Sequence, residues 1–549
     1  MNPLSKMQIA VVHCHFERGG VTQVVQNHVS SSRFVSDFPR FRLVSGGRLG
    51  GLQPGCLEET NPITIDGLDY DAWSEETLSE ETLHDRLVQA LAEEGCMRES
   101  TILHWHNHSL GKNTKTPGVI RRLADNGWRM LLQIHDFAED GRPENLMRLV
   151  HSLSVKSPES LDSALYPSAQ HVHYATLTSG DRDVLLKLGL PPSRVHLLPN
   201  GIDVAATAGS GSDEEGQPSK EDAIRRVRAA HGLPNDATWS IYPVRGIRRK
   251  NVGEWLLLSR WTAPHHYSGI TLPPATEIEF SSYQRWREVG AALAPRAVFD
   301  AGHHVDVSFM DNLMASEQVL STSVAEGFGM VFLEPWLVNR RVLGRRIQGV
   351  TDDFLAAGMD LEGSYEEIPI PGDADWNRLV RQEYREYLSK VWAGLPAAFQ
   401  VAEWKDEFEE PIDATEDGFD FGRLSTVRQV QVLKRCSIDS GFEEECKSRS
   451  ADLVRNLVSE GCSRVRSQVH RNRHCVNSRF GLPVQAQLLK QIYAVVAESP
   501  SEGAVTAPPE AGSGVRLAAK PHAFAPCRIE SQEAMDSSLR ELSESTAPQ

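Results

Sequence analysis

Ser323-Val-Ala-Glu-Gly-Phe-Gly-Met-Val-Phe-Leu-Glu334 places two carboxylates, Glu326 and Glu334, on either side of a glycine turn. The apolar residues before it are typical of a short strand, and Met330 to Asn339 are typical of a helix. Free N–H groups at a helix start suit an anion, and Gly327-Phe328-Gly329 would let a ligand approach the backbone closely. The pattern predicts a phosphate at the helix start and sugar hydroxyls that donate to the carboxylates. An ordinary turn with two solvated acids is the alternative.

A second turn supplies positive charge. The strand-like run Thr238 to Val244 is followed by Arg245-Gly-Ile-Arg-Arg-Lys250, which has four cations within six residues. Such a loop suits a diphosphate, because arginine binds it with two parallel hydrogen bonds and lysine acts as a point charge. We expect Arg245 and Lys250 to be ligands, with Arg248 and Arg249 as solvated loop charges.

Glycines and histidines follow strand-like runs in the first half of the chain. Gln8 to Val12 leads to Gly19-Gly20 and then to residues with helical spacing. Ser100 to Leu103 leads to His104-Trp-His-Asn-His108, and Arg129 to Ile134 leads to His135-Asp136. Since parallel strands end at one edge of a sheet, these groups are expected to line one rim.

Three of these histidines alternate along the chain. In an extended segment His104, His106 and His108 would share a face and could bind a metal ion. No neighbouring carboxylate or cysteine completes a ligand set, so buried, hydrogen-bonded histidines are the preferred interpretation and we expect no metal site.

The bulk composition excludes several kinds of partner. The chain has 549 residues, too many for one hydrophobic core, and a net charge of −17, which argues against nucleic acid and anionic membranes. No apolar run is long enough to span a membrane, and we expect no signal peptide, because residues 1–6 lead directly into a strand-like run. Eight cysteines without a Cys-x-x-Cys pair favour reduced thiols and a cytoplasmic protein.

Alternating strands and helices predict doubly wound parallel sheets of the α/β class. Residues 205–222, rich in glycine, serine and acids, mark the boundary between two halves. We expect an N-terminal Rossmann-like domain, a linker, a nucleotide-sugar-binding domain with a helical extension, a C-terminal helix and a disordered tail, at residues 1–205, 206–235, 236–481, 482–499 and 500–549.

Five short motifs follow one another along the chain: Gly19-Gly20, His135-Asp136, Leu198-Pro-Asn-Gly-Ile-Asp203, Arg245 with Lys250, and Glu326-x7-Glu334. In this order they resemble the motifs of one enzyme family, the retaining, nucleotide-sugar-dependent glycosyltransferases of the GT-B fold, family 4. The resemblance implies two Rossmann-like domains that face a central cleft, with the last helix crossing back to the first domain.

The resemblance also implies a role for each matching residue. Arg245 and Lys250 would clamp the donor diphosphate, Glu334 would bind the ribose, and Glu326 with the glycine turn would hold the transferred sugar. Gly20 would offer its amide to the phosphates, and His135 would contact the sugar near the reacting carbon. The implied catalytic residues are His135, Arg245, Lys250 and Glu326, and the donor-binding residues are Gly19, Gly20, Arg245, Lys250, Glu326, Gly327, Phe328, Gly329 and Glu334.

The implied reaction moves a hexose from a nucleotide-diphosphate sugar to a hydroxyl of a small-molecule or carbohydrate acceptor, with retention and without a metal or bound cofactor. Three departures from the family pattern leave the donor sugar open: Asn251, Pro335-Trp336 and Leu343-Gly-Arg345. A sugar-nucleotide epimerase, a phosphorylase and a non-catalytic nucleotide-sugar-binding protein are the alternatives.

Overall fold

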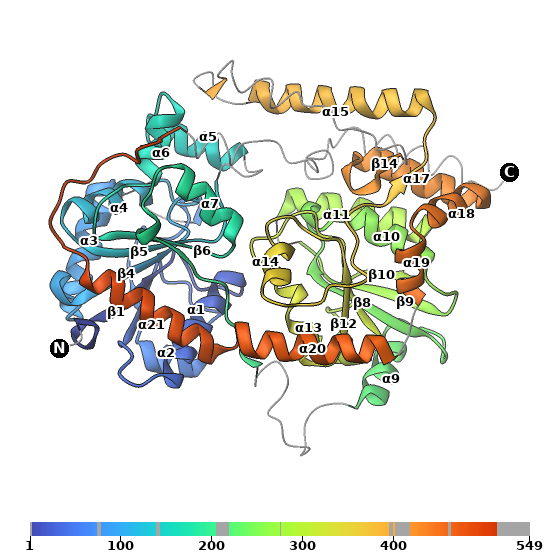
Figure 1. The fold of residues 1–549 in the computed structure, drawn as a ribbon, viewed down its shortest axis with the longest axis horizontal. Coiled ribbons are helices and arrows are strands. Elements are labelled where there is room, and N and C mark those ends of the chain that lie inside the picture. Colours follow the sequence, from blue (N-terminus) through green and yellow to red (C-terminus); the bar gives the residue numbers. More distant parts are fainter. Residues whose placement is uncertain are drawn as a thin grey trace. The chain divides into compact units, whose positions relative to one another are not determined.

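A computed structural model of the chain describes residues 3–73, 78–138, 143–204, 219–274, 276–394, 399–400, 418–458 and 463–512. The chain divides into two compact units, both built from parallel strands and helices (Figure 1). Of the described residues, those within 3–203, 390–400 and 478–512 belong to unit 1, and those within 204–389 and 418–477 belong to unit 2.

Unit 1 contains a seven-stranded parallel sheet in the order β3-β2-β1-β4-β5-β6-β7. The order reverses between β1 and β4, and the loops at such a point border the crevice where open α/β sheets bind ligands. The strands are β1 (Gln8–Val12), β2 (Phe41–Ser45), β3 (Ile63–Thr64), β4 (Thr101–His106), β5 (Arg129–Ile134), β6 (Val172–Thr176) and β7 (Val195–Leu197).

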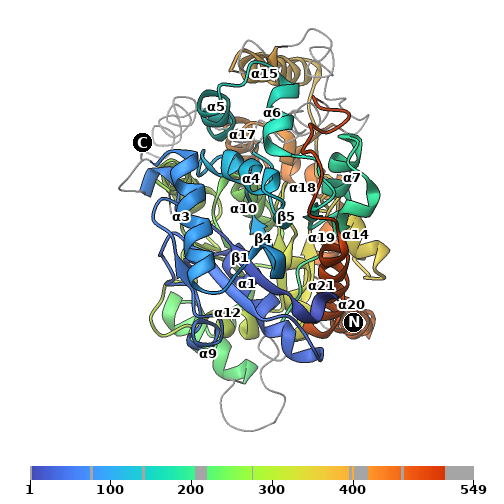
Figure 2. The ribbon, with the colours of Figure 1, turned by 90° about the vertical axis from the view of Figure 1, so that its left-hand side faces the viewer.

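Helices cover both faces of this sheet, which is why β4 is buried throughout and β5 is buried after its first residue, Arg129. One apolar layer packs the sheet against α1 (Gly20–Ser31), α2 (Pro54–Thr60) and α21 (Leu482–Glu498), and α21 lies beside the strands in Figures 1 and 2. The other layer packs it against α3 (Glu80–Glu93), α4 (Thr116–Asp125), α5 (Pro143–Ser152), α6 (Pro158–Leu165) and α7 (Ser179–Lys187). Short 3-10 turns are η1 (Pro3–Lys6), η2 (Ser32–Phe34), η3 (Asp71–Trp73), η4 (Arg98–Ser100) and η5 (Pro192–Arg194).

Unit 2 repeats the principle with five parallel strands in the order β10-β9-β8-β11-β12, so that its order reverses between β8 and β11. These strands are β8 (Thr238–Arg245), β9 (His266–Leu272), β10 (Ala297–Val298), β11 (Gln318–Ser321) and β12 (Arg341–Gly344), and β13 (Pro369–Ile370) pairs antiparallel with β14 (Phe419–Asp420).

The second half of the chain supplies the remaining helices. They are α9 (Lys220–His231), α10 (Val252–Trp261), α11 (Glu277–Leu293), α12 (Phe309–Ala315), α13 (Glu334–Leu337), α14 (Thr351–Ala356), α15 (Ala374–Gly394), α17 (Thr426–Ile438), α18 (Ser440–Arg449), α19 (Ala451–Val458) and α20 (Ser463–Phe480), with 3-10 turns η6 (Arg248–Lys250), η7 (Met330–Phe332) and η9 (Phe421–Arg423). The expected fold class, two doubly wound Rossmann-like α/β units, is confirmed.

Several local expectations were wrong. The expected helix from Met330 to Asn339 is the 3-10 turn η7 followed by the four-residue helix α13. His104 and His106 lie inside β4 and not in a loop after it.

The ends of the expected linker and tail also differ from the structure. Residues 220–231 form helix α9, and residues 205–218 lie outside the described part of the chain. Of the tail, residues 501–512 pack on unit 1, where Thr506 pairs with Ser168 and the Gly512 N–H donates to Asp162 over 2.7 Å. Residues 513–549 lie outside the described part. Within the described residues, no helix has the length and apolar composition needed to cross a membrane.

Candidate active site

The loops after β8 and β11 meet at the edge where the strand order of unit 2 reverses. The Val324 N–H donates to the Arg249 carbonyl over 3.0 Å, and the Thr322 hydroxyl donates to the Lys250 carbonyl over 2.9 Å. These bonds bring the ammonium group of Lys250 into contact with a carboxylate oxygen of Glu326. The cation and the acid, 76 residues apart in sequence, therefore form one buried pair.

Glu326 is held by a short chain of hydroxyl groups. The Ser323 hydroxyl donates to Glu326 Oε1 over 2.6 Å, and the Tyr242 hydroxyl lies 2.6 Å from that of Ser323. Burial opposes ionisation of Glu326, but the positive charges of Lys250 and Arg249 outweigh it and hold the pKa below its ordinary value. Glu326 is therefore a fixed carboxylate at neutral pH. Neither Ser323 nor Tyr242 was predicted as a site residue, although Ser323 stands only three residues before Glu326.

Glu334 is the opposite case, a carboxylate without a partner. It begins α13 and is half-buried, and among the described residues no hydrogen bond or ion pair reaches it. Burial raises its pKa to about 7. Because an unsatisfied carboxylate is costly to bury, the fold leaves at this position an acceptor that a ligand's hydroxyl groups could satisfy.

The other predicted residues of unit 2 are Arg245, Gly327, Phe328 and Gly329. Arg245 ends β8 with an exposed side chain that donates to the Pro273 carbonyl over 3.3 Å. Gly329 has a φ of +88°, and a Cβ there would meet Val350 at 3.0 Å, so the turn requires glycine. Gly327 is half-buried, and the ring of Phe328 packs edge-on against Phe354. Because α13 has only four residues, its dipole adds little charge stabilisation.

In unit 1 the Gly19-Gly20 turn opens α1. Gly19 precedes the helix in an extended conformation and gives it no side-chain cap. A Cβ on Gly20 would meet nothing within 4 Å, so neither crowding nor backbone conformation requires glycine there. The helix start is thus open to a close approach by another group.

His135 follows β5 at the same edge of the sheet. Its N–H donates to Asn107 Oδ1 over 2.8 Å, and Asn107 holds a left-handed φ of 54° while its own N–H donates to the Gln133 carbonyl. Its imidazole Nε2 lies 2.8 Å from Nδ1 of His106. Burial lowers the pKa of His135 to about 4, with a small opposing effect of Asp136, so the ring is neutral at pH 7.

The alternating histidines of this segment, His104, His106 and His108, are buried in the core. His104 bonds to Tyr493 of α21 over 2.7 Å and to Gln133 over 2.9 Å, whereas His108 bonds to the Leu165 carbonyl over 2.8 Å. Of the three alternating histidines, His108 therefore lies apart from the other two, and His28 of α1 takes the third place beside His104 and His106.

His28, His104 and His106 form a buried cluster whose nitrogens lie within 4.8 Å of one another. Neighbouring rings stack, with centroids 4.5 Å apart for His104 and His106 and planes 28° apart. Stacked rings direct their lone pairs side by side and not toward one point, which a shared ion would require. Burial and the other histidines lower the pKa values of His28 and His106, and no carboxylate among the described residues acts on these rings. A divalent cation here would therefore lack a negative charge to balance it.

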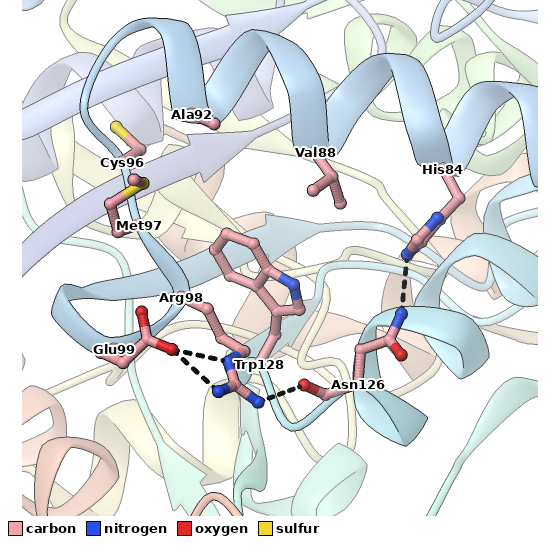
Figure 3. Close-up of a pocket in the computed structure, with 9 residues that line it drawn as sticks. All are labelled: His84, Val88, Ala92, Cys96, Met97, Arg98, Glu99, Asn126 and Trp128. Carbon is pink, nitrogen blue, oxygen red and sulfur yellow. Dashed lines mark hydrogen bonds and ion pairs between the residues drawn. The ribbon is translucent and has the colours of Figure 1, made fainter.

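A cavity of about 400 Å³ lies in unit 1 at the opposite edge of the sheet, where β4 and β5 begin (Figure 3). Its polar groups bind one another: the Arg98 guanidinium contacts Glu99 and the Asn126 carbonyl, and the Asn126 amide contacts His84. Trp128 and α3 supply its apolar walls. The cavity therefore contains none of the predicted site residues.

The chain is similar in sequence to one known enzyme and in fold to several solved structures. No model of a protein family matches the chain. A mannosylglucosyl-3-phosphoglycerate synthase from Petrotoga mobilis is 25% identical over 395 residues, which are 69% of this chain and 72% of that protein. A glycosyltransferase from Rickettsia africae has a similar fold, with a TM-score of 0.50 and 11% identity over 90% of this chain and 99% of that one. HepE of Anabaena with bound UDP-glucose gives a TM-score of 0.49, with 12% identity over 89% and 99% of the chains.

The similarity in sequence to this synthase confirms the prediction of an enzyme of the glycosyltransferase class. The individual roles of the site residues, and the expectation that His135 and Glu326 face one cleft, stay predictions.

Proposed function

We propose that this chain is a retaining glycosyltransferase that moves a hexose from a nucleotide-diphosphate sugar to a hydroxyl acceptor without a metal ion. The observation that carries the proposal is Glu334, a half-buried carboxylate eight positions after Glu326 and without a hydrogen-bond partner among the described residues. Ribose hydroxyls are donors that would satisfy it.

The chemistry follows from the charges at the same sheet edge. The anomeric C–O bond breaks, and the electron pair leaves with the diphosphate. Arg245 and Lys250 would stabilise that negative charge, while the fixed carboxylate of Glu326 would accept hydrogen bonds from the sugar. The acceptor oxygen forms the new bond on the same face, and its proton passes to the departing phosphate oxygen.

The named relative suggests substrates to test first. Mannosylglucosyl-3-phosphoglycerate contains mannosyl, glucosyl and phosphoglycerate groups. We therefore propose a mannosyl donor and glucosyl-3-phosphoglycerate as the first pair for this chain, with unphosphorylated glucosylglycerate as the matched acceptor that lacks the phosphate. UDP-, GDP- and ADP-sugars are ranked by the increase in Tm that each produces, since a ligand bound by the folded state stabilises it.

Product analysis tests the reaction itself. Transfer that gives the α-anomer from an α-linked donor, and that continues in EDTA, supports the proposal. Inversion at the anomeric carbon, or loss of activity in EDTA that Mg²⁺ restores, contradicts its retaining or metal-independent part. Turnover that needs inorganic phosphate indicates a phosphorylase, and donor conversion without acceptor indicates an epimerase. Glu334→Ala and Arg245→Ala should each weaken donor binding sharply.

A further inference from the structure

The imidazole of His135 has one nitrogen inside the protein and one that a ligand can reach. Nε2 lies 2.8 Å from Nδ1 of His106, which is fully buried. Nδ1 has no hydrogen-bond partner among the described residues and is not sealed from solvent, and His135 keeps 7% of its surface exposed. A ligand at this sheet edge would therefore meet Nδ1.

The two rings share one hydrogen bond, so the proton position in one decides that in the other. Both are neutral at pH 7, because burial lowers the pKa of His135 to about 4 and that of His106 well below its ordinary value. A neutral imidazole has one N–H and one bare nitrogen. If His106 donates from Nδ1, His135 accepts at Nε2 and carries its own proton on Nδ1.

Either Nδ1 of His106 or Nε2 of His135 can donate the hydrogen bond between the two rings. The other nitrogen of His106 decides between these two arrangements. Nε2 of His106 is buried and has no hydrogen-bond partner within the part of the chain that the structure describes. A proton there would leave a buried N–H without an acceptor, an arrangement that folded proteins rarely contain. A nitrogen that carries only a lone pair costs less free energy when it has no partner. The proton of His106 therefore belongs on Nδ1, which donates to Nε2 of His135.

We propose that His106 is a positioning residue that holds His135 in the Nδ1–H tautomer, so that His135 offers its ligand a neutral hydrogen-bond donor and not a base. The identity of that ligand rests on the proposed function: it is a hydroxyl or phosphoryl oxygen of the nucleotide sugar. The backbone supports the same arrangement, because Asn107 accepts from the His135 N–H and His13 Nδ1 donates to the His106 carbonyl over 3.3 Å.

The tautomer can be observed without any activity. The full chain is labelled with ¹⁵N-histidine, and long-range ¹H–¹⁵N correlation spectra distinguish protonated from bare ring nitrogens. The His135 signals are assigned by their loss in His135→Gln. We expect a protonated Nδ1 and a bare Nε2 in His135; the reverse pattern overturns the proposal. This result holds or fails whether or not the chain transfers a sugar.

Variants of His106 test the consequence for turnover. His106→Phe keeps a ring in the stack but removes the donor, whereas His106→Asn keeps an amide N–H near the position of Nδ1. His28→Phe is the matched control, because His28 packs against the His106 ring with centroids 5.7 Å apart and makes no hydrogen bond to His135.

We expect kcat to fall about tenfold in His106→Phe with the KM for the donor unchanged, as for the loss of one hydrogen bond. His106→Asn should restore most of the lost kcat, and the kcat of His28→Phe should match that of the wild type. An equal loss in His28→Phe, or no rescue by His106→Asn, shows that the cluster only stabilises the fold and overturns the positioning role. Absence of any glycosyl transfer refutes the proposed function alone, and the spectrum then decides the tautomer.

Discussion

The protonation of Glu334 should make binding of a nucleotide sugar depend on pH. The free protein holds this carboxyl with a pKa of about 7, raised by burial from its ordinary 4.5. Ribose hydroxyls that donate to it favour the ionised form, so binding lowers the pKa and releases a proton below pH 7. Affinity is therefore full above pH 7 and declines as the pH falls.

The size of the effect follows from the pKa. At pH 6 about nine-tenths of the free protein carries the proton on Glu334, and affinity should be about tenfold weaker than at pH 8. This corresponds to about 1.4 kcal/mol. Glu334→Gln removes the titrating group but keeps its shape. Its affinity should be independent of pH and, at pH 8, weaker than that of the wild type by roughly tenfold to a hundredfold, as for the loss of a charged hydrogen bond.

Isothermal titration calorimetry with an intact nucleotide sugar measures this directly. Both phosphates of that ligand stay ionised from pH 6 to 8, so the protein alone supplies the proton. Titrations in buffers with different ionisation enthalpies count the protons released. A wild-type affinity that is flat or that rises toward pH 6, or an equal slope in Glu334→Gln, would refute the reasoning.

Three further predictions concern stability and the Glu326 anchor. Buried histidines with lowered pKa values stabilise the fold above pH 6.5 and lose that contribution below it, so the urea concentration at the unfolding midpoint should fall from pH 7 to 5. His28→Phe removes one such group and should reduce the pH dependence of the unfolding free energy by about 1.4 kcal/mol per pH unit. Arg345→Met leaves the buried carboxylates that it binds, including Glu254 at 2.6 Å, without a cation; unfolding free energy should drop by about 3–5 kcal/mol, and an unchanged midpoint would contradict this. Ser323→Ala should lower kcat/KM about tenfold with an unchanged Tm, because Glu326 loses one hydrogen bond; full activity would exclude that anchor.

Local sequence determined the elements whose apolar residues form one continuous run. The expected strands Gln8 to Val12 and Arg129 to Ile134 coincide with β1 and β5, and the strand-like run Thr238 to Val244 lies in β8. Strands buried on both faces are apolar throughout, so their limits can be read from composition. Short runs are ambiguous: the alternating run Ile278-Glu-Phe280 fits a strand but lies in α11, because three residues do not distinguish the period of a strand from that of a helix.

The histidines of β4 show where local reasoning failed. Polar residues after an apolar run usually mark the end of a strand, and the sequence therefore predicted a rim of imidazoles. His104 instead continues the strand, because Tyr493, 389 residues later, and Gln133 satisfy its two nitrogens inside the core. Only the packing of α21 against the sheet supplies the first of these partners.

By itself, the sequence determined the α/β class, the alternation of strands and helices, and which acids, cations and glycines follow strand ends. The tertiary structure decided which of them touch and in which protonation state. Lys250 meets Glu326 because two parallel strands far apart in sequence lie side by side, and Glu334 has a raised pKa because many surrounding residues exclude water from it. Pairing and burial depend on contacts between distant parts of the chain, so no single stretch of sequence determines them.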